Sequence, residues 1–236
     1  AAVTFAQLSG KEVGVYVTVE DFQHYWQRAN ERISSSYSGL HFGHYKAASF
    51  DHDLSVLHAA KLSAKAERGV PLARWGIGVT VLLEKVMGET YVNKLRAICL
   101  FEADFNWLNK LIFARRMMQL ASSSDFIPEE IHSKKGSHCT KAMVSKVCFC
   151  DGSRILHNPA ALGEEDFGEC YDRAAHAPTS IGLQAWGIPV SACRLLFMAL
   201  QTMQFCLRTG FGESKELFGG TAEEPFGGLG QGNTMA

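Results

Sequence analysis

Residues 77–83, IGVTVLL, and residues 94–100, KLRAICL, decide the fold class of this 236-residue chain. The first stretch is a run of β-branched and aliphatic residues with the length of a buried strand, and the second alternates its side chains between two faces. A third strand is predicted at residues 13–19, where valine alternates with glycine, tyrosine and threonine. Three short segments are therefore expected to form strands.

Helical patterns surround these strands. They cover residues 21–33, residues 53–68, a segment that begins at Asp104, and residues 189–210. In the third helix Phe105, Leu108 and Ile112 share one face, and in the last a core stripe is formed by Leu196, Leu200, Met203 and Leu207. Because strands and helices do not alternate regularly, the pattern predicts an α+β fold.

The composition excludes several classes of protein. The chain is 47% hydrophobic and 20% charged, with a formal net charge of −1. No apolar run approaches the roughly 18 residues that a membrane span needs, so no membrane partner is expected. The first residues, AAVTFAQLSGKE, lack the basic and apolar regions of a signal peptide, which predicts an intracellular protein, nuclear or cytoplasmic and not secreted. Both ends of the sequence are expected to be cuts through a longer reading frame.

The seven cysteines are an odd number and are scattered, which argues against a secreted disulfide framework. Cys139, Cys148, Cys150 and His157 could in principle supply four zinc ligands. However, a Cys-x-Cys spacing with one distant histidine matches no common structural zinc pattern. Reduced, partly buried thiols are therefore favoured over a zinc site.

Charge is unevenly distributed along the chain. Basic residues gather between residues 85 and 154, and acidic residues accumulate after residue 163. The near-neutral total argues against a protein that binds polyanions over its whole surface. A local basic surface and an ordinary solvated face both fit this pattern.

Two short stretches contain residues suited to chemistry. GEEDFGECYDRAAH (163–176) places Asp166 and Asp172 six positions apart, with Tyr171 directly before the second. By itself this spacing fits a metal site, or equally a helix cap and a surface charge. The glycines around Gln231 allow the backbone to lie close to a ligand, while the Gln231 amide can bind a base or a sugar.

Six motifs in order resemble the reverse transcriptase domain of non-LTR-type retroelements. They are SGLHFGHYK (38–46), RWGIGVTVLLEK (74–85), KLRAICLFEADFN (94–106), CYDR…H (170–176), RTGFGES (208–214) and GLGQGN (228–233). The resemblance covers residues 34–236. It implies a right-hand polymerase with an N-terminal extension (1–33), a fingers-like region (34–150) and a partial palm from motif A to motif B (151–236).

The resemblance implies a two-metal nucleotidyl transfer in which dNTPs are added to a DNA primer on an RNA template. Asp166 matches the catalytic motif-A aspartate that binds Mg²⁺. Lys85 and Arg96 match the basic pair that closes on the incoming triphosphate. The basic residues between 110 and 146 are expected to line the template track by contacting phosphates.

The same resemblance assigns roles in the palm. Tyr171 matches the bulky aromatic residue that lies under the sugar and excludes a 2′-hydroxyl, although a core aromatic is the alternative. Gln231 and Gly232 match the motif-B pair that contacts the nucleotide or the template. Asp172 is expected to be structural, as a cap of the following helix.

Two departures from the family pattern leave a second interpretation open. The sequence stops before the aromatic-x-Asp-Asp motif and the thumb, so the chain alone is not expected to extend a primer. The strand expected before Asp166 reads AALGEE, with glycine and two glutamates where apolar residues belong. The alternative is a catalytically dead retroelement remnant or a domesticated nucleic-acid-binding module.

Overall fold

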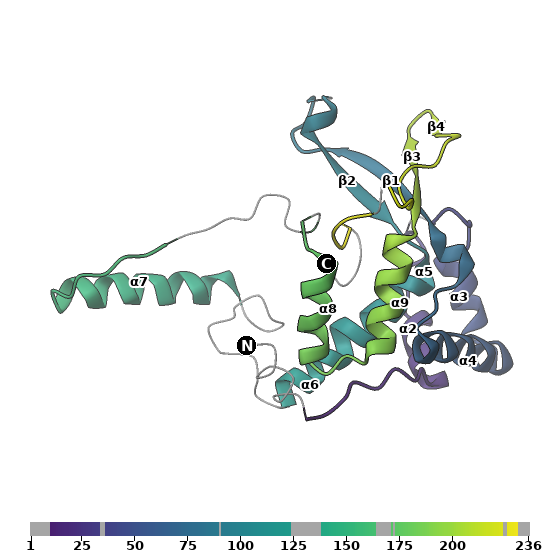
Figure 1. Cartoon of the computed structure of the whole chain (residues 1–236), viewed down its shortest axis with the longest axis horizontal. Helices are drawn as coiled ribbons and strands as arrows, with labels where there is room; N and C mark the ends of the chain where they lie inside the picture. The colour runs from purple at the N-terminus through teal and green to yellow at the C-terminus, as the bar shows by residue number, and fades with distance from the viewer. Residues whose placement is uncertain are drawn as a thin grey trace. The chain divides into compact units, whose positions relative to one another are not determined.

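The computed structural model describes residues 10–33, 36–89, 91–123, 138–163, 171, 173–223 and 226–230. The chain divides into two compact units, one made of residues 1–120 and 169–236 and the other of residues 121–168 (Figure 1). The first contains helices and a four-stranded mixed sheet, which confirms the α+β class. None of the helices within the described ranges has the length and apolar content needed to cross a bilayer.

The sheet of the first unit has the strand order β2-β1-β3-β4. Its strands are β1 (Ile77–Glu84), β2 (Leu95–Leu100), β3 (Gln204–Thr209) and β4 (Gly212–Glu213). β1 pairs antiparallel with β2, with Val79 opposite Leu100 and Leu83 opposite Arg96. β1 also pairs parallel with β3, although more than 100 residues separate them in the chain. The strands predicted at 77–83 and 94–100 are thus confirmed.

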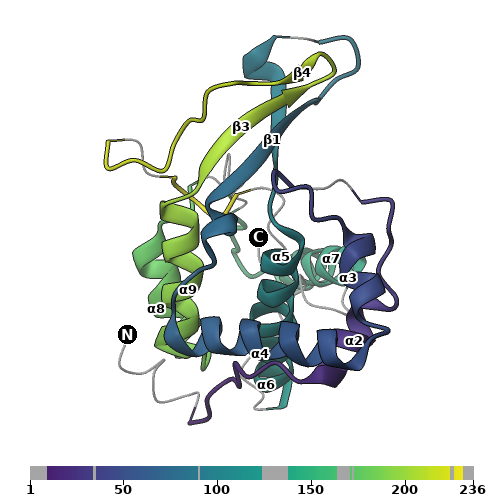
Figure 2. The same cartoon turned by 90° about the vertical axis from the view of Figure 1, so that its right-hand side faces the viewer.

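The β1/β2 hairpin extends away from the helices of its unit (Figures 1 and 2). Burial follows this geometry, because Gly78, Val79 and Thr80 are buried while Glu84 at the far end is exposed. Eight residues of strand reach roughly 26 Å at about 3.3 Å per residue. The hairpin therefore has a packed base and a solvent-exposed end.

Helices α2 (Val19–Trp26), α3 (Phe42–Ala48) and α4 (His52–Arg68) pack against one another at the base of the unit. Asp51 caps α4 by accepting a hydrogen bond from the Leu54 amide at 2.9 Å, and Gly69 ends it in the left-handed region. The helix predicted at 53–68 is confirmed. The helix predicted at 21–33 begins earlier, after the Thr18 cap, and ends at Trp26.

A continuous helical segment follows β2. It comprises α5 (Ala103–Asn109), a π-helical stretch (Lys110–Arg116) and α6 (Met117–Ser123). The predicted face of Phe105, Leu108 and Ile112 is buried. These side chains join a large aromatic core with Phe22 and Trp107, whose rings lie 5.6 Å apart edge to face.

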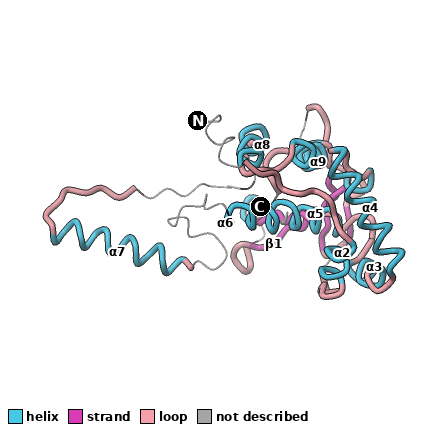
Figure 3. The backbone as a smooth tube through the Cα atoms, turned by 90° about the horizontal axis from the view of Figure 1, so that it is seen from below, coloured by secondary structure: helices cyan, strands magenta, loops and turns pink. Residues whose placement is uncertain are grey.

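Helices α8 (His176–Ala185) and α9 (Val190–Gln201) lie side by side (Figure 3). The helix predicted at 189–210 begins one residue later than expected, with Pro189 at the N-cap position directly before it, and ends at Gln201, so the prediction of a helix to residue 210 is wrong. Leu207 belongs to β3 instead of the helical core stripe. Pairing with β1 buries Phe205 and Cys206, and this tertiary contact outweighs the helical preference of the neighbouring leucine and methionine.

The strand predicted at 13–19 is also wrong. This segment is extended but pairs with no described strand. The Val13 amide donates to the Gly187 carbonyl at 2.7 Å, and the Val17 amide donates to Ser63 Oγ at 2.8 Å. Val13 and Val17 are buried, so the alternating valines pack against helices instead of a sheet. Residues 10–33 thus contribute to the core of the first unit.

The described part of the second unit contains α7 (Cys139–Ile155), which has no buried residue. Residue 150 lies inside this helix, so the expected division between residues 150 and 151 does not coincide with the two compact units. The assignment of fingers and palm regions stays a prediction.

Candidate functional site

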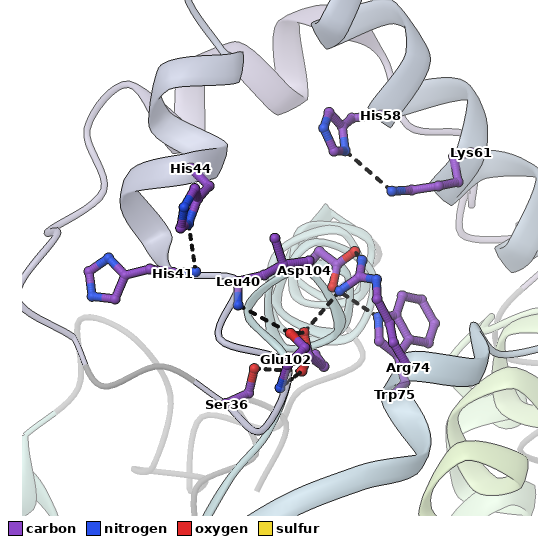
Figure 4. Close-up of polar contacts among 11 residues, drawn as sticks. Ser36, Leu40, His41, His44, His58, Lys61, Arg74, Trp75, Glu102 and Asp104 are labelled. Atoms are coloured by element: carbon purple, nitrogen blue, oxygen red, sulfur yellow. Dashed lines mark hydrogen bonds and ion pairs between the residues drawn. The ribbon is translucent and has the colours of Figure 1, made fainter.

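A buried ion-pair network lies where the base of the hairpin meets α5 (Figure 4). Arg74 precedes β1 in a short 3-10 helix (Ala73–Gly76), whereas Glu102 and Asp104 follow β2. The Arg74 guanidinium binds Glu102 Oε2 at 2.9 Å and also binds Asp104 Oδ2. Both carboxylates are completely buried. One arginine therefore connects the chain entering β1 to the chain leaving β2.

The carboxylate oxygens of Glu102 and Asp104 also accept hydrogen bonds from other side chains. Trp75 Nε1 donates to Asp104 Oδ1 at 2.9 Å. Ser36 Oγ donates to Glu102 Oε1 at 2.6 Å, and Ser38 Oγ donates to Glu102 Oε2 at 2.9 Å. All four oxygens are thus used within the protein, so this acidic pair is a structural anchor and does not offer open positions for a metal ion.

Three further titratable side chains lie near the network. Burial raises the pKa of Tyr45, and the nearby Asp104 adds to this effect. His58 and Lys61 extend from α4 toward Asp104, and His58 Nδ1 lies 3.4 Å from Lys61 Nζ (Figure 4). Burial lowers the pKa of His58, with the Lys61 charge as the second cause, and burial also lowers the pKa of Lys61.

Opposing effects act on the arginine itself. Burial, the largest single effect, would lower the pKa of Arg74, but the charges of Asp104, Tyr45 and Glu102 and the hydrogen bond to Asp104 together outweigh it, so the pKa is raised. Arg74 therefore stays cationic and neutralises the two buried acids. The network connects the two ends of the hairpin at its base, and the far end projects from this anchored base.

The far end of the hairpin carries exposed cations. Arg96 lies opposite Leu83 in the sheet register, and Lys85 directly follows β1. Lys94 directly precedes β2. We call Lys85, Lys94 and Arg96 the hairpin-tip cations. The structure thus brings the two predicted triphosphate contacts, Lys85 and Arg96, to the same end of one hairpin.

Aromatic and acidic side chains accompany these cations. Tyr91 is 75% exposed in the connection between β1 and β2, and Phe211 is fully exposed in the neighbouring turn between β3 and β4. Glu84 and Glu89 also lie near the tip, and Glu84 Oε2 accepts a hydrogen bond from the Gly88 amide at 2.8 Å. Exposed aromatic rings beside cations suit contact with bases and phosphates together.

A second group of motif residues meets at α8. The Leu229 amide donates to the Tyr171 carbonyl at 2.8 Å. His176, the first residue of α8, makes a hydrogen bond to the Gly228 carbonyl at 2.5 Å. Tyr171 is 44% exposed, so the structure does not support its alternative as a core aromatic. The motif around residues 170–176 is thereby joined to the one that begins at Gly228.

Several predicted residues lie outside the described residues. Asp166, the expected catalytic residue and Mg²⁺ ligand, is one of them, as are Gln231 and Gly232. The same holds for Asp172, the expected helix cap. Within the described ranges, no group of three or more His, Cys, Asp or Glu side chains is placed to hold a metal ion.

The basic residues expected along a template track have different environments. Arg116 donates to the Gly14 and Tyr16 carbonyls at 2.7 and 2.8 Å and pairs with Asp21 at 2.6 Å. Lys110 lies over the Tyr25 ring, 5.4 Å from its centre. Arg116 therefore holds the N-terminal segment in place, and its assignment to a template track is not supported by these contacts.

Among the described residues, the cysteines of α7 and His157 are not gathered into a group that could hold a metal ion. Cys139, Cys148 and Cys150 are exposed, which corrects the expectation of partial burial, while Cys99, Cys193 and Cys206 are buried. Cys148 and Cys150 are two residues apart on a helix, so their side chains point to different sides. Burial raises the pKa of Cys193 to about 11.

The anchor formed by Arg74, Glu102 and Asp104 was not predicted from the sequence. A signal was present, because Glu102 and Asp104 interrupt the apolar stretch LFEADF directly after a predicted strand. Charged residues in such a context are buried only when they are paired. The partner could not be read from the sequence, because Arg74 lies 28 positions away from Glu102.

Comparison with known proteins does not assign the chain to a family. No family model matches the chain, and no curated protein matches it either.

Proposed function

We propose that this chain contains the fingers and part of the palm of an RNA-directed DNA polymerase. In this proposal it binds an RNA template, a DNA primer and a dNTP. The observation that carries the proposal is the hairpin tip, where Lys85 and Arg96 are exposed on an arm whose base is fixed by Arg74. These are the two residues that match the triphosphate contacts of the resembled family.

The physical argument concerns charge and rigidity. A triphosphate concentrates negative charge on a few oxygens, and the charge moves to the pyrophosphate as it leaves. A guanidinium offers a planar pair of donors to phosphate oxygens, while an ammonium adds a compact positive charge. A hairpin anchored at its base presents both groups without a large entropic cost of ordering, which favours stabilisation of the transition state.

Residues beyond the tip complete the proposal. Asp166, with Glu164 and Glu165 beside it in the sequence, offers the carboxylate oxygens that Mg²⁺ prefers. Bound Mg²⁺ would activate the primer oxygen and neutralise phosphate charge. The exposure of Tyr171 is compatible with a contact to the nucleotide sugar. Gln231 and Gly232 are the proposed contacts to the nucleotide or the template.

A second candidate is a nucleic-acid-binding module without catalysis. It is favoured by the segment before Asp166, because Ala160, Ala161, Leu162 and Gly163 are exposed and lie outside any strand. The resembled family has a buried strand in this position. A chain that has lost this strand can retain binding through its hairpin while the metal site no longer forms.

Nucleotide binding by the whole chain tests the proposal. In the presence of Mg²⁺ and a primer–template hybrid, the affinity for a fluorescent dNTP is measured for the unchanged chain and for Arg96→Ala. Loss of one charge-assisted phosphate contact is expected to weaken binding by about 2 kcal/mol, or roughly thirtyfold. The matched control is Arg68→Ala, which removes an exposed arginine from the end of α4.

Asp166→Ala separates the two candidates. Loss of Mg²⁺-dependent dNTP binding in this variant supports the polymerase fragment. Hybrid binding that persists with no nucleotide effect in any variant supports the non-catalytic module. Equal dNTP affinity of Arg96→Ala and Arg68→Ala would show that the tip does not bind triphosphate.

A further inference from the structure

We propose that the outward-facing side of α4 binds a second copy of this chain, with the two α4 helices running antiparallel. The surface is made of four side chains, Asp53, Leu57, Ala64 and Arg68, which we call the outer face of α4. Figure 2 shows α4 turned toward the viewer, at the other end of the first unit from β4. The proposal is therefore independent of nucleotide binding at the hairpin tip.

The opposite side of α4 is used within the chain. It packs against α2, α3 and α9. The residues buried there are Ser55, Ala59, Leu62, Ser63 and Ala66. At about 100° of rotation per residue, the outer face lies on the other side of the helix. Asp53, Leu57 and Arg68 are exposed, and Ala64 is partly exposed.

Apolar side chains are exposed on this side and beyond both ends of the helix. Leu57 is 62% exposed, and Leu54, one turn before it, is also exposed. Phe50, which precedes α4, is 71% exposed, and Val70, which follows it, is exposed as well. Single exposed apolar residues are common, but a row of them along one helix is typical of a surface that contacts another protein.

Charge makes the outer face complementary to itself. Asp53 lies in the first turn of α4, and Arg68 is its last residue, fifteen positions later. They are about 22 Å apart along the helix at 1.5 Å per residue, so they cannot pair within one chain. The neighbouring charges, Asp51 at the first end and Lys65 and Glu67 at the second, keep the first end negative and the second end positive. Each end therefore fits the opposite end of another copy.

The spacing of the outer face is symmetrical, as contact between two identical chains requires. Asp53, Leu57, Ala64 and Arg68 follow one another at intervals of 4, 7 and 4 residues. A two-fold axis through the middle of α4 therefore places each Asp53 opposite Arg68 of the other copy. The same axis places each Leu57 opposite Ala64. A large side chain then packs against a small one at two equivalent positions, which allows the helices to approach closely.

The size of the surface predicts a weak dimer. α4 has 17 residues and is thus about 26 Å long. Stable interfaces bury about 800 Å² on each partner, which is more than one helix face offers. We expect a dissociation constant on the order of 10–100 µM. Dilute solutions well below this range contain the monomer, so stability and dNTP affinity measured there report the single chain.

Sedimentation velocity of the full chain, at concentrations below and above this range, tests the proposal. The unchanged chain is expected to pass from monomer to dimer. Leu57→Asp places a charge in both apolar contacts and should weaken the dimer at least tenfold. The matched control is Leu156→Asp, because Leu156 is an equally exposed leucine at the end of α7. It should leave the dimer unchanged.

Charge reversal tests the antiparallel arrangement. Asp53→Arg and Arg68→Glu each place like charges opposite one another twice, so either variant alone should dimerise about tenfold more weakly. In an equal mixture of the two variants every such contact joins opposite charges. The mixture should therefore regain the affinity of the unchanged chain. Equal melting temperatures of dilute samples show that the variants are folded.

Several results would overturn the proposal without touching the proposed function. They are a monomer at every concentration, a dimer that Leu57→Asp leaves intact, and a dimer that Leu156→Asp dissociates instead. Failure of the mixed charge variants to regain affinity would overturn the antiparallel contact. No dNTP or hybrid is present in these measurements, so a failure of the proposed function does not affect them.

Discussion

Removal of the Arg74 guanidinium is expected to destabilise the first unit strongly. Arg74→Met keeps much of the aliphatic stem but leaves Glu102 and Asp104 without a cation, and both carboxylates are completely buried. Breaking a buried ion pair costs about 3–5 kcal/mol. The Arg74 side chain is 25% exposed, so water can partly replace it and the lower end of this range, about 3 kcal/mol, is expected.

This magnitude can be measured directly. In a unit of this size 1 kcal/mol corresponds to about 2–4 °C, so the melting temperature of Arg74→Met should fall by about 6–12 °C. Urea denaturation followed by tryptophan fluorescence gives the same free energy independently, because Trp75 is buried beside Asp104. The control Arg68→Met, at an exposed site, should change stability by less than about 0.5 kcal/mol.

A compensating variant tests the reason for the loss. Glu102→Gln and Asp104→Asn added to Arg74→Met remove both buried charges but keep acceptors for Ser36 and Trp75. This triple variant should recover at least half of the lost stability. A loss below about 1 kcal/mol in Arg74→Met, or no recovery in the triple variant, would refute the reasoning that buried charge anchors the hairpin.

Two further predictions concern stability. The pKa of His58 is lowered in the folded state by burial and by Lys61, so the unfolded chain binds more protons once the pH falls below the ordinary value of 6.5. The unfolding free energy of the unchanged chain should therefore decrease from pH 7.5 to pH 5.5, and more steeply than that of His58→Gln. Parallel curves of unfolding free energy against pH for the two proteins would contradict the prediction. In Gly78→Ala a Cβ atom would lie 2.6 Å from Phe205 Cε1, so a loss of about 1–3 kcal/mol is expected, measured against Gly76→Ala, which meets no atom within 4 Å. Equal stability of the two alanine variants would contradict the close approach of Gly78 to Phe205.

The sequence predicted correctly those helices and strands whose pattern of apolar residues matches the faces that are buried in the structure. The apolar run of β1, the glycine that ends α4 and the buried stripe of α5 are all encoded within a few residues. The segments at 13–19 and 202–210 were assigned incorrectly, because their conformation depends on distant partners. Val17 binds Ser63, and Phe205 lies beside Gly78 in the parallel pairing of β1 with β3.

In the candidate site, too, contacts between residues far apart in the chain could not be predicted. Lys85 and Arg96 could be paired from the sequence only through the family resemblance, and the register of β1 with β2 then brings them to one hairpin end. The Arg74 network and the contact of His176 with Gly228 could not be predicted, because each joins residues that are far apart in the chain. The local periodicity of one sequence does not show which distant residues contact each other.

The salt dependence of dNTP binding tests the central claim, that the hairpin tip binds the triphosphate, most directly. The affinity of the full chain for a labelled dNTP is measured by fluorescence anisotropy in the presence of Mg²⁺ and an RNA–DNA hybrid at several salt concentrations, with Lys85, Lys94 and Arg96 intact or all replaced by alanine. Salt screens the attraction between exposed cations and phosphate oxygens. We expect the triple variant to bind the dNTP more weakly and with a smaller salt dependence than the intact chain, with Arg68→Ala unchanged. Equal affinity and equal salt dependence for the intact chain and the triple variant would contradict the claim that the hairpin tip binds the triphosphate.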